Sequence, residues 1–506
     1  EVPPDGERIN ADVPDSAVEQ VPEGGLELVA HARSLTVPDP DRDPVPVRTV
    51  TIFLVNRRRV VRRVYADVTS AFQTRLEVHC AEGLEPRRDF SDYQADDEDL
   101  RLADLHYRGE AEFAVGRNVS AGWAEPDADG VVRRAWTDPL PNAEVERVAP
   151  SRIDGVEFGV EALAEAAGQG GAALDQALAE LPRQYRTWIE GQRVARAGLA
   201  PRRRETADRL VGGMESVCGR IEEGIAVLAQ DERARLAFRI MNTAIARALR
   251  RRSAGPDGDP AKQKAPGWYP FQLAFILLNL PGLNEKTHPD REVVDLLFFP
   301  TGGGKTEAYL GLAAFVIARR RLSATGVLGA GVAVIMRYTL RLLTLDQLGR
   351  AAAVICALEL IRTDDAFKGD DGRPRLGEWP IEIGLWVGSD SSPNVLGGRG
   401  HTGDHTAVTR VRRYRKDRRR GAPAPIKGCP WCGTPFEPNS FKCEPNEHAP
   451  VNMTVRCMNP ACEFTQDRPL PILTVDETIY RRLPAFVIAT VVKFASLPWV
   501  GDTGAF

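Results

Sequence analysis

A glycine-rich segment between a strand-type run and a helix-type run constrains the fold of this chain most strongly. The segment reads Phe-Pro-Thr-Gly-Gly-Gly-Lys-Thr at residues 299–306. The β-branched and aromatic residues 293–299 predict a buried strand, and the apolar spacing in residues 306–322 predicts a helix. Three successive glycines permit positive φ, so backbone N–H groups can converge on phosphate oxygens at the helix N-terminus. The segment therefore predicts a phosphate-binding loop in an α/β fold.

The residues of this loop indicate ATP and Mg²⁺ as ligands. Lys305 would reach the β- and γ-phosphates and Thr306 would bind Mg²⁺, so we expect both to be catalytic. Phe299 stands where the general phosphate-loop pattern has its first glycine, and the Pro-Thr-Gly that follows resembles motif I of superfamily 2 helicases. The loop residues expected to contact the nucleotide are Pro300, Thr301, Gly302, Gly303, Gly304, Lys305 and Thr306.

Strand-type and helix-type runs alternate on both sides of the loop. We expect a helix to open at residues 268–272, strands at 331–336 and 381–387, and a helix at 344–362. Such alternation predicts a parallel sheet with right-handed crossovers, whose ligands bind at the carboxyl ends of the strands. The expected architecture is a RecA-like lobe.

Further motifs extend the resemblance to superfamily 2 helicases. Phe271-Gln272 resembles the adenine-reading Q motif, in which the ring stacks on the base and the amide pairs with its edge. The segments at 337–347 and 488–494 resemble motifs that contact a nucleic-acid backbone, although Val492 stands where an acidic residue is expected, and a solvated strand end is the alternative for the first segment. The DNA contacts that these motifs imply are Arg337, Thr339, Arg341, Thr490 and Lys493.

Taken together, residues 268–275, 298–309, 336–347 and 488–494 resemble the large helicase subunit of DISARM anti-phage systems, the DrmA type. The resemblance implies an ATP-dependent DNA helicase or translocase in bacterial defence, with DNA and a DrmB-type subunit as partners. The DrmB-type partner follows from the resemblance alone. A nucleotide-gated DNA-binding or scaffold module that does not hydrolyse ATP is the alternative function.

Four cysteines in an insertion predict a structural zinc site. Cys429-Pro-Trp-Cys432-Gly has the form of a zinc-ribbon knuckle, and Cys457 and Cys462 supply a second pair. Four thiolates complete a tetrahedral Zn²⁺ site without an open position. Because the second pair is spaced more widely than is usual, Cys443 and His448 remain alternative ligands.

A dense basic run precedes the first knuckle. It contains Arg410, Arg412, Arg413, Arg415, Lys416, Arg418, Arg419 and Arg420, with Tyr414 among them. In a chain with a formal net charge of −4, such a local patch is a candidate site for a nucleic-acid backbone, with Arg412, Arg413 and Arg415 as the expected contacts. A mobile, solvated loop is the alternative interpretation.

The length of 506 residues predicts about three domains. The expected fold class is multidomain, α+β and α/β. No apolar run approaches the ~20 residues that span a membrane, and eight cysteines, half of them clustered, fit a reducing cytoplasm. The expected order is a poorly ordered Pro-rich acidic arm (1–46), a β-rich domain (47–150), a helical domain (151–252), a linker (253–264) and a partial first RecA-like lobe (265–506) whose insertion (about 389–470) holds the basic loop and the zinc-ribbon-like module.

The resemblance also implies parts that this sequence lacks. After the Thr490 strand a helicase lobe continues to a strand that ends in Asp-Glu, and a second lobe provides an arginine finger. Asp476-Glu477 comes before the Thr490 strand, so we do not assign it that role. We expect the chain to be an N-terminal portion of a larger protein, or one of two polypeptides that complete it.

Overall fold

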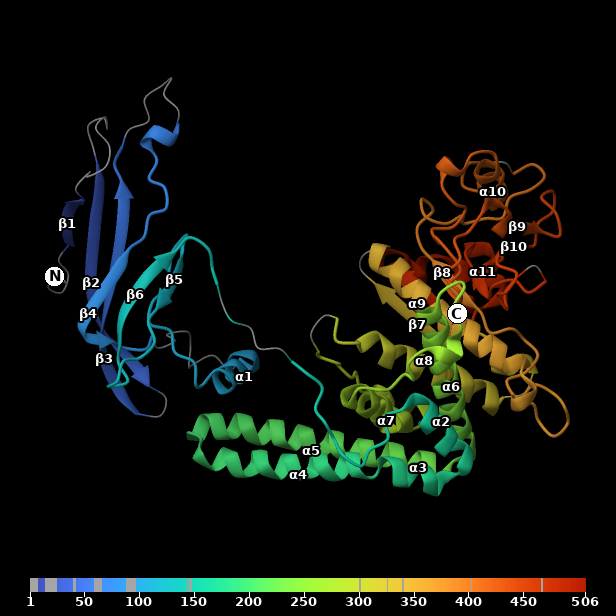
Figure 1. Ribbon diagram of the computed structural model, residues 1–506, viewed down its shortest axis with the longest axis horizontal. Helices are drawn as coiled ribbons and strands as arrows, with labels where there is room; N and C mark the ends of the chain where they lie inside the picture. The colour runs from blue at the N-terminus through green and yellow to red at the C-terminus, as the bar shows by residue number, and fades with distance from the viewer. Residues whose placement is uncertain are drawn as a thin grey trace. The chain divides into compact units, whose positions relative to one another are not determined.

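The chain forms two compact units in a computed structural model (Figure 1). One unit consists of Glu1–Arg147 and Glu190–Gly213, and the other of Val148–Ile189 and Met214–Phe506. The residues that the structure describes are 8–13, 25–39, 42–58, 66–87, 97–142, 144, 148–299, 302–324, 326–338, 341–401, 403–465 and 467–506.

The first unit contains two antiparallel sheets, as the predicted β-rich N-terminal region requires. One sheet has the order β1-β2-β3 and the other the order β4-β6-β5. Strands β1 and β2 lie within residues 1–46, for which composition predicts a poorly ordered arm, and β2 pairs along its length with β3. The elements are β1 (Arg8–Val13), β2 (Leu26–Asp39), β3 (Arg42–Asn56), β4 (Glu77–Leu84), α1 (Glu98–His106), β5 (Ser120–Trp123) and β6 (Val132–Asp138).

Helices fill the middle of the chain, and α4 and α5 contribute residues to both units. Helix α6 is central to the second unit, because it packs against α2, α8 and α9. Asp231 caps its first turn by accepting hydrogen bonds from the backbone N–H groups of Arg233 (2.8 Å) and Ala234 (3.1 Å). The helices are α2 (Val160–Gln169), α3 (Gly171–Leu178), α4 (Glu180–Ala195), α5 (Pro201–Gln230), α6 (Glu232–Ala254) and α7 (Pro270–Asn284).

A parallel sheet of four strands follows, in the order β11-β8-β12-β7. Alternate residues of β12 point to opposite faces: Phe486 and Ile488 join the main core, and Val487 and Ala489 join a second core around Trp386. Helix α9 packs against β7, β8 and β12. The elements of this region are α8 (Lys305–Ser323), β7 (Val334–Tyr338), α9 (Arg341–Thr363), β8 (Ile383–Trp386), β11 (Ile472–Leu473), α11 (Asp476–Arg482), β12 (Phe486–Thr490) and α12 (Val491–Ala495).

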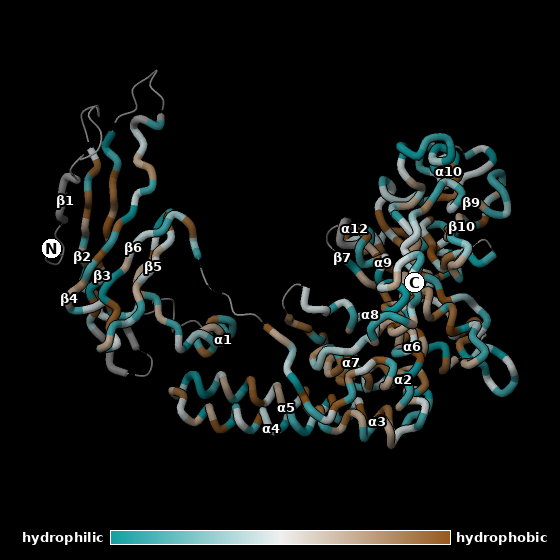
Figure 2. Tube along the Cα trace, viewed as in Figure 1, coloured by the Kyte–Doolittle hydropathy of each residue, from teal (hydrophilic) through white to brown (hydrophobic). Residues whose placement is uncertain are grey.

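The insertion between β8 and β11 contains α10 (Ala407–Lys416) and a hairpin of β9 (Phe441–Glu444) and β10 (Asn452–Val455). Its apolar residues belong to the same core as α6, α8 and α9. Figure 2 shows apolar residues along the helices that meet in this unit. Among the residues that the structure describes, no helix combines the length and the apolar character needed to cross a membrane.

Residues 293–299 differ from the expected buried strand. The structure describes these residues and assigns them to no strand, and Val294, Leu296 and Phe298 are 93%, 85% and 91% exposed. Arg220 fixes the start of the run by donating two hydrogen bonds to the Asp295 carboxylate (2.7 and 2.8 Å). A strand forms only where another strand offers it hydrogen bonds, and none in the described residues pairs with this run.

Candidate functional site

The predicted phosphate loop leads directly into helix α8. Gly302 and Gly304 have φ angles of 85° and 89°, in the left-handed region that glycine adopts without strain. A Cβ atom on Gly304 would also lie 2.8 Å from Nε2 of Gln272, so a larger residue here would displace that side chain. The Lys305 ammonium donates a hydrogen bond to the Phe299 carbonyl. The free N–H groups of the first turn of α8 and the helix dipole make this turn suitable for an anion.

Gln272 supports this loop from helix α7. Its side-chain Nε2 donates to the Gly304 carbonyl at 2.6 Å, and its Oε1 accepts from the backbone N–H of Tyr269 at 2.7 Å. The side chain is buried, with 3% of its residue surface exposed. Both ends of the amide are therefore engaged by the chain, and Gln272 holds the backbone of the loop in place.

Phe271, the predicted adenine-stacking residue, lies beside the loop. Its ring stacks on Phe299, with ring centroids 4.0 Å apart, and the Tyr269 ring lies nearly parallel to it with centroids 6.0 Å apart. The structure thus brings Phe271, Gln272, Gly304 and Lys305 together. Pro300 and Thr301 lie outside the described residues.

Two of the residues predicted to contact DNA, Arg337 and Thr490, lie at the carboxyl ends of β7 and β12, which are neighbouring parallel strands. The Arg337 guanidinium lies over the Phe494 ring, 5.0 Å from its centroid, and Thr490 directly precedes α12. Thr339 and the side chain of Arg341 lie outside the described residues. Adjacent strand ends therefore place Arg337 and Thr490 at one edge of the sheet.

Lys493, which is also predicted to contact DNA, forms an ion pair with an acidic residue inside the protein. Its ammonium lies 2.5 Å from Oδ2 of Asp476, a residue that is only 4% exposed. Burial raises the pKa of the Asp476 carboxyl, and the hydrogen bond from Lys493 opposes that rise. The pair joins the start of α12 to the start of α11, so Lys493 has a structural contact besides its predicted DNA contact.

The predicted basic loop contains helix α10, whose buried face is Val408, Val411 and Tyr414. Tyr414 packs edge-on against Phe441, with centroids 5.9 Å apart. The alternative of a mobile loop therefore fails for residues 407–416, because the helix is anchored in the core of the insertion.

Acidic residues already pair with the three arginines predicted to bind DNA in this helix. Arg412 and Arg415 both contact Glu447, each at 2.7 Å, and Arg413 contacts Asp404. All three arginines are on the surface, where such pairs contribute little to stability. Phosphate groups could therefore replace these carboxylates at small cost.

The four predicted zinc ligands form one buried cluster. The sulfur atoms of Cys429, Cys432, Cys457 and Cys462 lie within 4.8 Å of one another. Backbone N–H groups approach two of the sulfurs: Asn459 donates to Cys457 (3.4 Å) and Phe464 to Cys462 (3.5 Å). The arrangement offers four thiolates to one metal ion, which fits zinc and leaves no open position.

The thiols of the cluster are close enough to change one another's pKa. A hydrogen bond from Cys429 lowers the pKa of Cys432, and the shared proton raises the pKa of Cys429. Cys443 faces elsewhere, from strand β9, and burial raises its pKa to about 11. Neither Cys443 nor His448 belongs to the cluster, so the structure resolves the predicted alternatives in favour of the four clustered cysteines.

The chain is similar in sequence to a known protein. The chain is 32% identical to the DISARM protein DrmA of Bacillus paralicheniformis, in an alignment of 505 residues that covers 93% of the chain and 42% of the relative. This chain is a homologue of DISARM protein DrmA. It spans less than half of the length of that relative. No protein-family model matches the chain.

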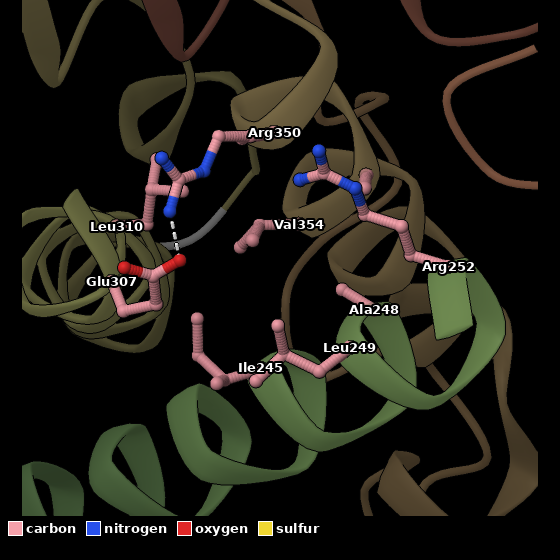
Figure 3. Close-up of a pocket in the computed structure, with 9 residues that line it drawn as sticks. Ile245, Ala248, Leu249, Arg252, Glu307, Leu310, Arg350 and Val354 are labelled. Carbon is pink, nitrogen blue, oxygen red and sulfur yellow. Dashed lines mark hydrogen bonds and ion pairs between the residues drawn. The ribbon is translucent and has the colours of Figure 1, made fainter. Parts of the chain in front are cut away.

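One contact beside the loop of this DrmA homologue was not predicted from its sequence. Glu307, in the first turn of α8, forms an ion pair with Arg350 of α9, at one side of a crevice between α6, α8 and α9 (Figure 3). Glu307 and Arg350 are 43 positions apart, so no local sequence pattern indicates their contact.

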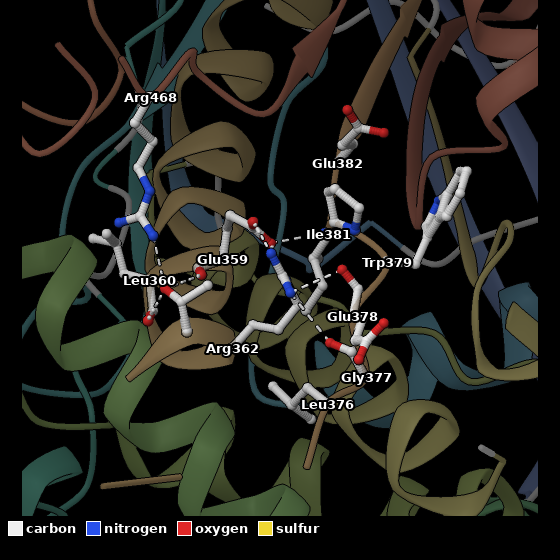
Figure 4. Close-up of polar contacts among 12 residues, drawn as sticks. Glu359, Leu360, Arg362, Leu376, Gly377, Glu378, Trp379, Ile381, Glu382 and Arg468 are labelled. Atoms are coloured by element: carbon white, nitrogen blue, oxygen red, sulfur yellow. Dashed lines mark hydrogen bonds and ion pairs between the residues drawn. The ribbon is translucent and has the colours of Figure 1, made fainter. Parts of the chain in front are cut away.

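A polar network further from the loop fixes the chain before strand β8 (Figure 4). Arg362 donates two hydrogen bonds to Glu359, at 2.7 and 2.6 Å, and others to the carbonyls of Gly377 (3.2 Å) and Glu378 (3.0 Å). Glu359 in turn accepts from the backbone N–H of Ile381 at 2.9 Å. The end of α9 thereby sets the position at which β8 enters the sheet.

Proposed function

We propose that the chain is the ATP-binding part of an ATP-dependent superfamily 2 DNA helicase or translocase in a bacterial anti-phage system of the DISARM type. The observation that carries the proposal is the left-handed Gly304 directly before Lys305 at the start of α8, in a homologue of DISARM protein DrmA. Because the chain spans 42% of that relative, hydrolysis, translocation, a cytoplasmic location and a DrmB-type partner are all parts of the proposal.

Lys305 and Thr306 are the proposed catalytic residues. The loop fits a nucleotide, because residues 302–306 offer backbone N–H donors, an ammonium and a hydroxyl, and contain no carboxylate. Lys305 would exchange the Phe299 carbonyl for the β- and γ-phosphates, and the Thr306 hydroxyl would be a ligand of Mg²⁺. Bound Mg²⁺ supplies positive charge that offsets the charge developing on the phosphates.

The proposal also accounts for a free edge of the sheet and for an exposed apolar run outside it. In the described residues β7 pairs on one side only, and the apolar run 293–299 is exposed. An unpaired strand edge and an exposed strand-type run are both sites where further strands can add. We propose that strands from outside this sequence complete the sheet, one of them ending in the Asp-Glu pair that a helicase requires.

The proposed DNA path runs over the carboxyl ends of β7 and β12. Arg337, Thr339, Arg341, Thr490 and Lys493 would contact the backbone there. Arg412, Arg413 and Arg415 would extend the contact from α10 on the insertion, whose fold the clustered cysteines would stabilise by binding Zn²⁺.

ATP hydrolysis by the full-length protein, measured with and without DNA, tests the proposal. We expect turnover that rises when DNA is added and is lost in Lys305→Ala. Arg183→Ala is the control, because it alters only an exposed side chain of α4 and should hydrolyse ATP normally. Arg321→Lys would not serve as a control, because Arg321 is buried. Equal turnover with and without DNA would exclude a DNA-driven motor.

The alternative of a nucleotide-gated binding module predicts a different result from the same protein. Hydrolysis would be absent, but the affinity for DNA would still change when ATP or ADP is added.

A further inference from the structure

Three glycines lie inside the two long helices α4 and α5 at positions where packing does not require them. Gly191 lies in α4, and Gly212 and Gly213 lie in α5. All three are exposed, none has a positive φ, and a Cβ atom at any of them would meet no other atom within 4 Å. Gly224 of α5 differs, because a Cβ there would lie 2.0 Å from the carbonyl oxygen of Leu277. Close packing therefore explains Gly224 and leaves the other three unexplained.

The unexplained glycines lie at nearly the same level of the hairpin that α4 and α5 form (Figure 1). Arg196, at the turn of the hairpin, pairs with Asp208 of α5 at 2.9 Å and fixes the register of the two helices. Gly191 lies five residues before Arg196, and Gly212 lies four residues after Asp208. Because both helices rise about 1.5 Å per residue, glycine occurs in both at one level of the hairpin.

The two ends of α5 are anchored by different contacts. Before the glycines, Arg203 donates two hydrogen bonds to Asp104 of α1, at 2.9 and 2.8 Å. After them, the buried side chains of Ile221, Ile225 and Leu228 belong to the main core. Each end of the helix is therefore held more firmly than the stretch between them.

The division of the chain into two compact units falls at the level of the glycines. Residues 190–213, which form the tip of the hairpin, belong to the first unit, and the flanking residues of α4 and α5 belong to the second. The division passes through helices that continue across it. Apart from proline, glycine is the least favourable residue in a helix interior, so each helix is weakest close to this division.

We propose that Gly191, Gly212 and Gly213 form a hinge at which the α4–α5 hairpin bends. Bending at this level moves the tip, together with the first unit, while the base of the hairpin stays packed in the second unit. The glycines absorb the change in backbone angles that a bend requires. The hinge is independent of the nucleotide and DNA sites of the proposed function.

Distance distributions in the full-length protein test the hinge. Spin labels are introduced as non-natural amino acids at Asp175 and Ala197, exposed positions in the base-side unit and in the tip, and the distance is measured by double electron–electron resonance. A second pair, at Asp175 and the exposed Ser216, lies within one unit and serves as the rigid reference. We expect a broad distribution for the first pair, and a narrow one once all three glycines are replaced with alanine.

Amide hydrogen exchange provides a second measurement on the same variants. Because alanine favours the helix, exchange within residues 187–195 and 209–217 should slow by about fivefold for each glycine replaced in that helix. Exchange at the two ends of α5 should stay as in the wild type. Equal rates at the glycine level in wild type and variant would contradict a weak point there.

Gly219→Ala is the matched control. Gly219 is also exposed on α5 with open space at its Cβ position, but it lies on the base side, next to Cys218, whose thiol is hydrogen-bonded to the Pro182 carbonyl at 3.5 Å. This variant makes the same chemical change outside the hinge, so the distance distribution of the first pair should stay broad.

Two results would overturn the hinge. The first is a wild-type distribution for the tip pair that is as narrow as that of the reference pair, because the hairpin would then be rigid. The second is a broad distribution that the three alanines leave unchanged, because the motion would then arise elsewhere. Melting temperatures equal to or above that of the wild type show that the variants are folded.

Discussion

The side-chain amide of Gln272 donates a 2.6 Å hydrogen bond to the carbonyl of Gly304, the residue that turns the chain into α8. The predicted role for Gln272 was to read the edge of adenine. The bond instead places the amide under the loop backbone. We therefore expect Gln272 to affect the binding of any nucleotide that the loop holds, whatever its base.

Substitution of Gln272 tests this difference. In Gln272→Ala the partly buried Tyr269 N–H and Gly304 carbonyl both lose the bond to this side chain, at a cost of up to about 1–3 kcal/mol for each group. We expect the affinities for ADP and GDP to fall together, by about 10-fold. Calorimetric titration with both nucleotides measures this. A loss confined to ADP would show that Gln272 reads the base.

Lys493 and Asp476 provide a second prediction, on stability. Lys493→Met leaves the buried Asp476 carboxylate without its counter-charge, and the variant should lose about 2–4 kcal/mol of unfolding free energy at neutral pH. Because burial raises the Asp476 pKa above 3.8 in the folded protein, this carboxyl favours folding below pH 3.8 and loses that contribution as pH rises through the folded pKa.

The stability deficit of Lys493→Met should therefore be small near pH 4 and grow towards neutral pH. Thermal or urea unfolding at several pH values measures it, and Lys493→Arg, which keeps the charge, is the control. A deficit that is independent of pH would show that Asp476 is not its source.

Removing the charge of Glu447 should strengthen DNA binding, whereas removing an arginine beside it should weaken DNA binding. This one carboxylate neutralises both Arg412 and Arg415. Glu447→Gln should strengthen DNA binding by about 2- to 5-fold at low salt, because two guanidinium groups become available to phosphates. Arg412→Ala should weaken binding and reduce the dependence of log K on log salt concentration by about one.

Fluorescence anisotropy over a range of salt concentrations measures both effects. Arg183→Ala, on α4, should leave the salt dependence unchanged. If Glu447→Gln also leaves it unchanged, α10 does not contact DNA.

Metal content tests the cysteine cluster. The purified protein should contain one zinc ion, and Cys432→Ser should lose it, together with the protease resistance of residues 421–470. Zinc binding of this kind contributes on the order of 10 kcal/mol to folding. Cys443→Ser, which removes a buried thiol outside the cluster, should retain the metal. Full protease resistance after complete removal of zinc would contradict a structural role.

Local chemistry explains which features could be predicted from the sequence. The positive φ at Gly302 and Gly304 follows from their lack of a side chain, and the spacing of Cys429 and Cys432 follows from the geometry of a metal knuckle. The alternation of strands and helices likewise predicted the parallel sheet. Helix α10 was also open to prediction, because Val408, Val411 and Tyr414 recur at helical spacing within the basic run.

Long-range contacts explain what the sequence did not reveal. Residues 293–299 have the composition of a strand, but a strand depends on a neighbour that the run itself does not specify. The pairing of Glu307 with Arg350, and of Lys493 with Asp476, arises from the way separate elements pack. The sequence indicated neither pairing: Lys493 was predicted to contact DNA, and Asp476 was assigned no role.

Equilibrium binding of Mg²⁺·ADP to this chain tests the central claim most directly. The account predicts saturable binding of one nucleotide, with an affinity that falls at least about 10-fold in Lys305→Ala because the ammonium contact to the phosphates is lost. Binding by Lys305→Ala that equals the wild type, or no binding by the wild type, would contradict it.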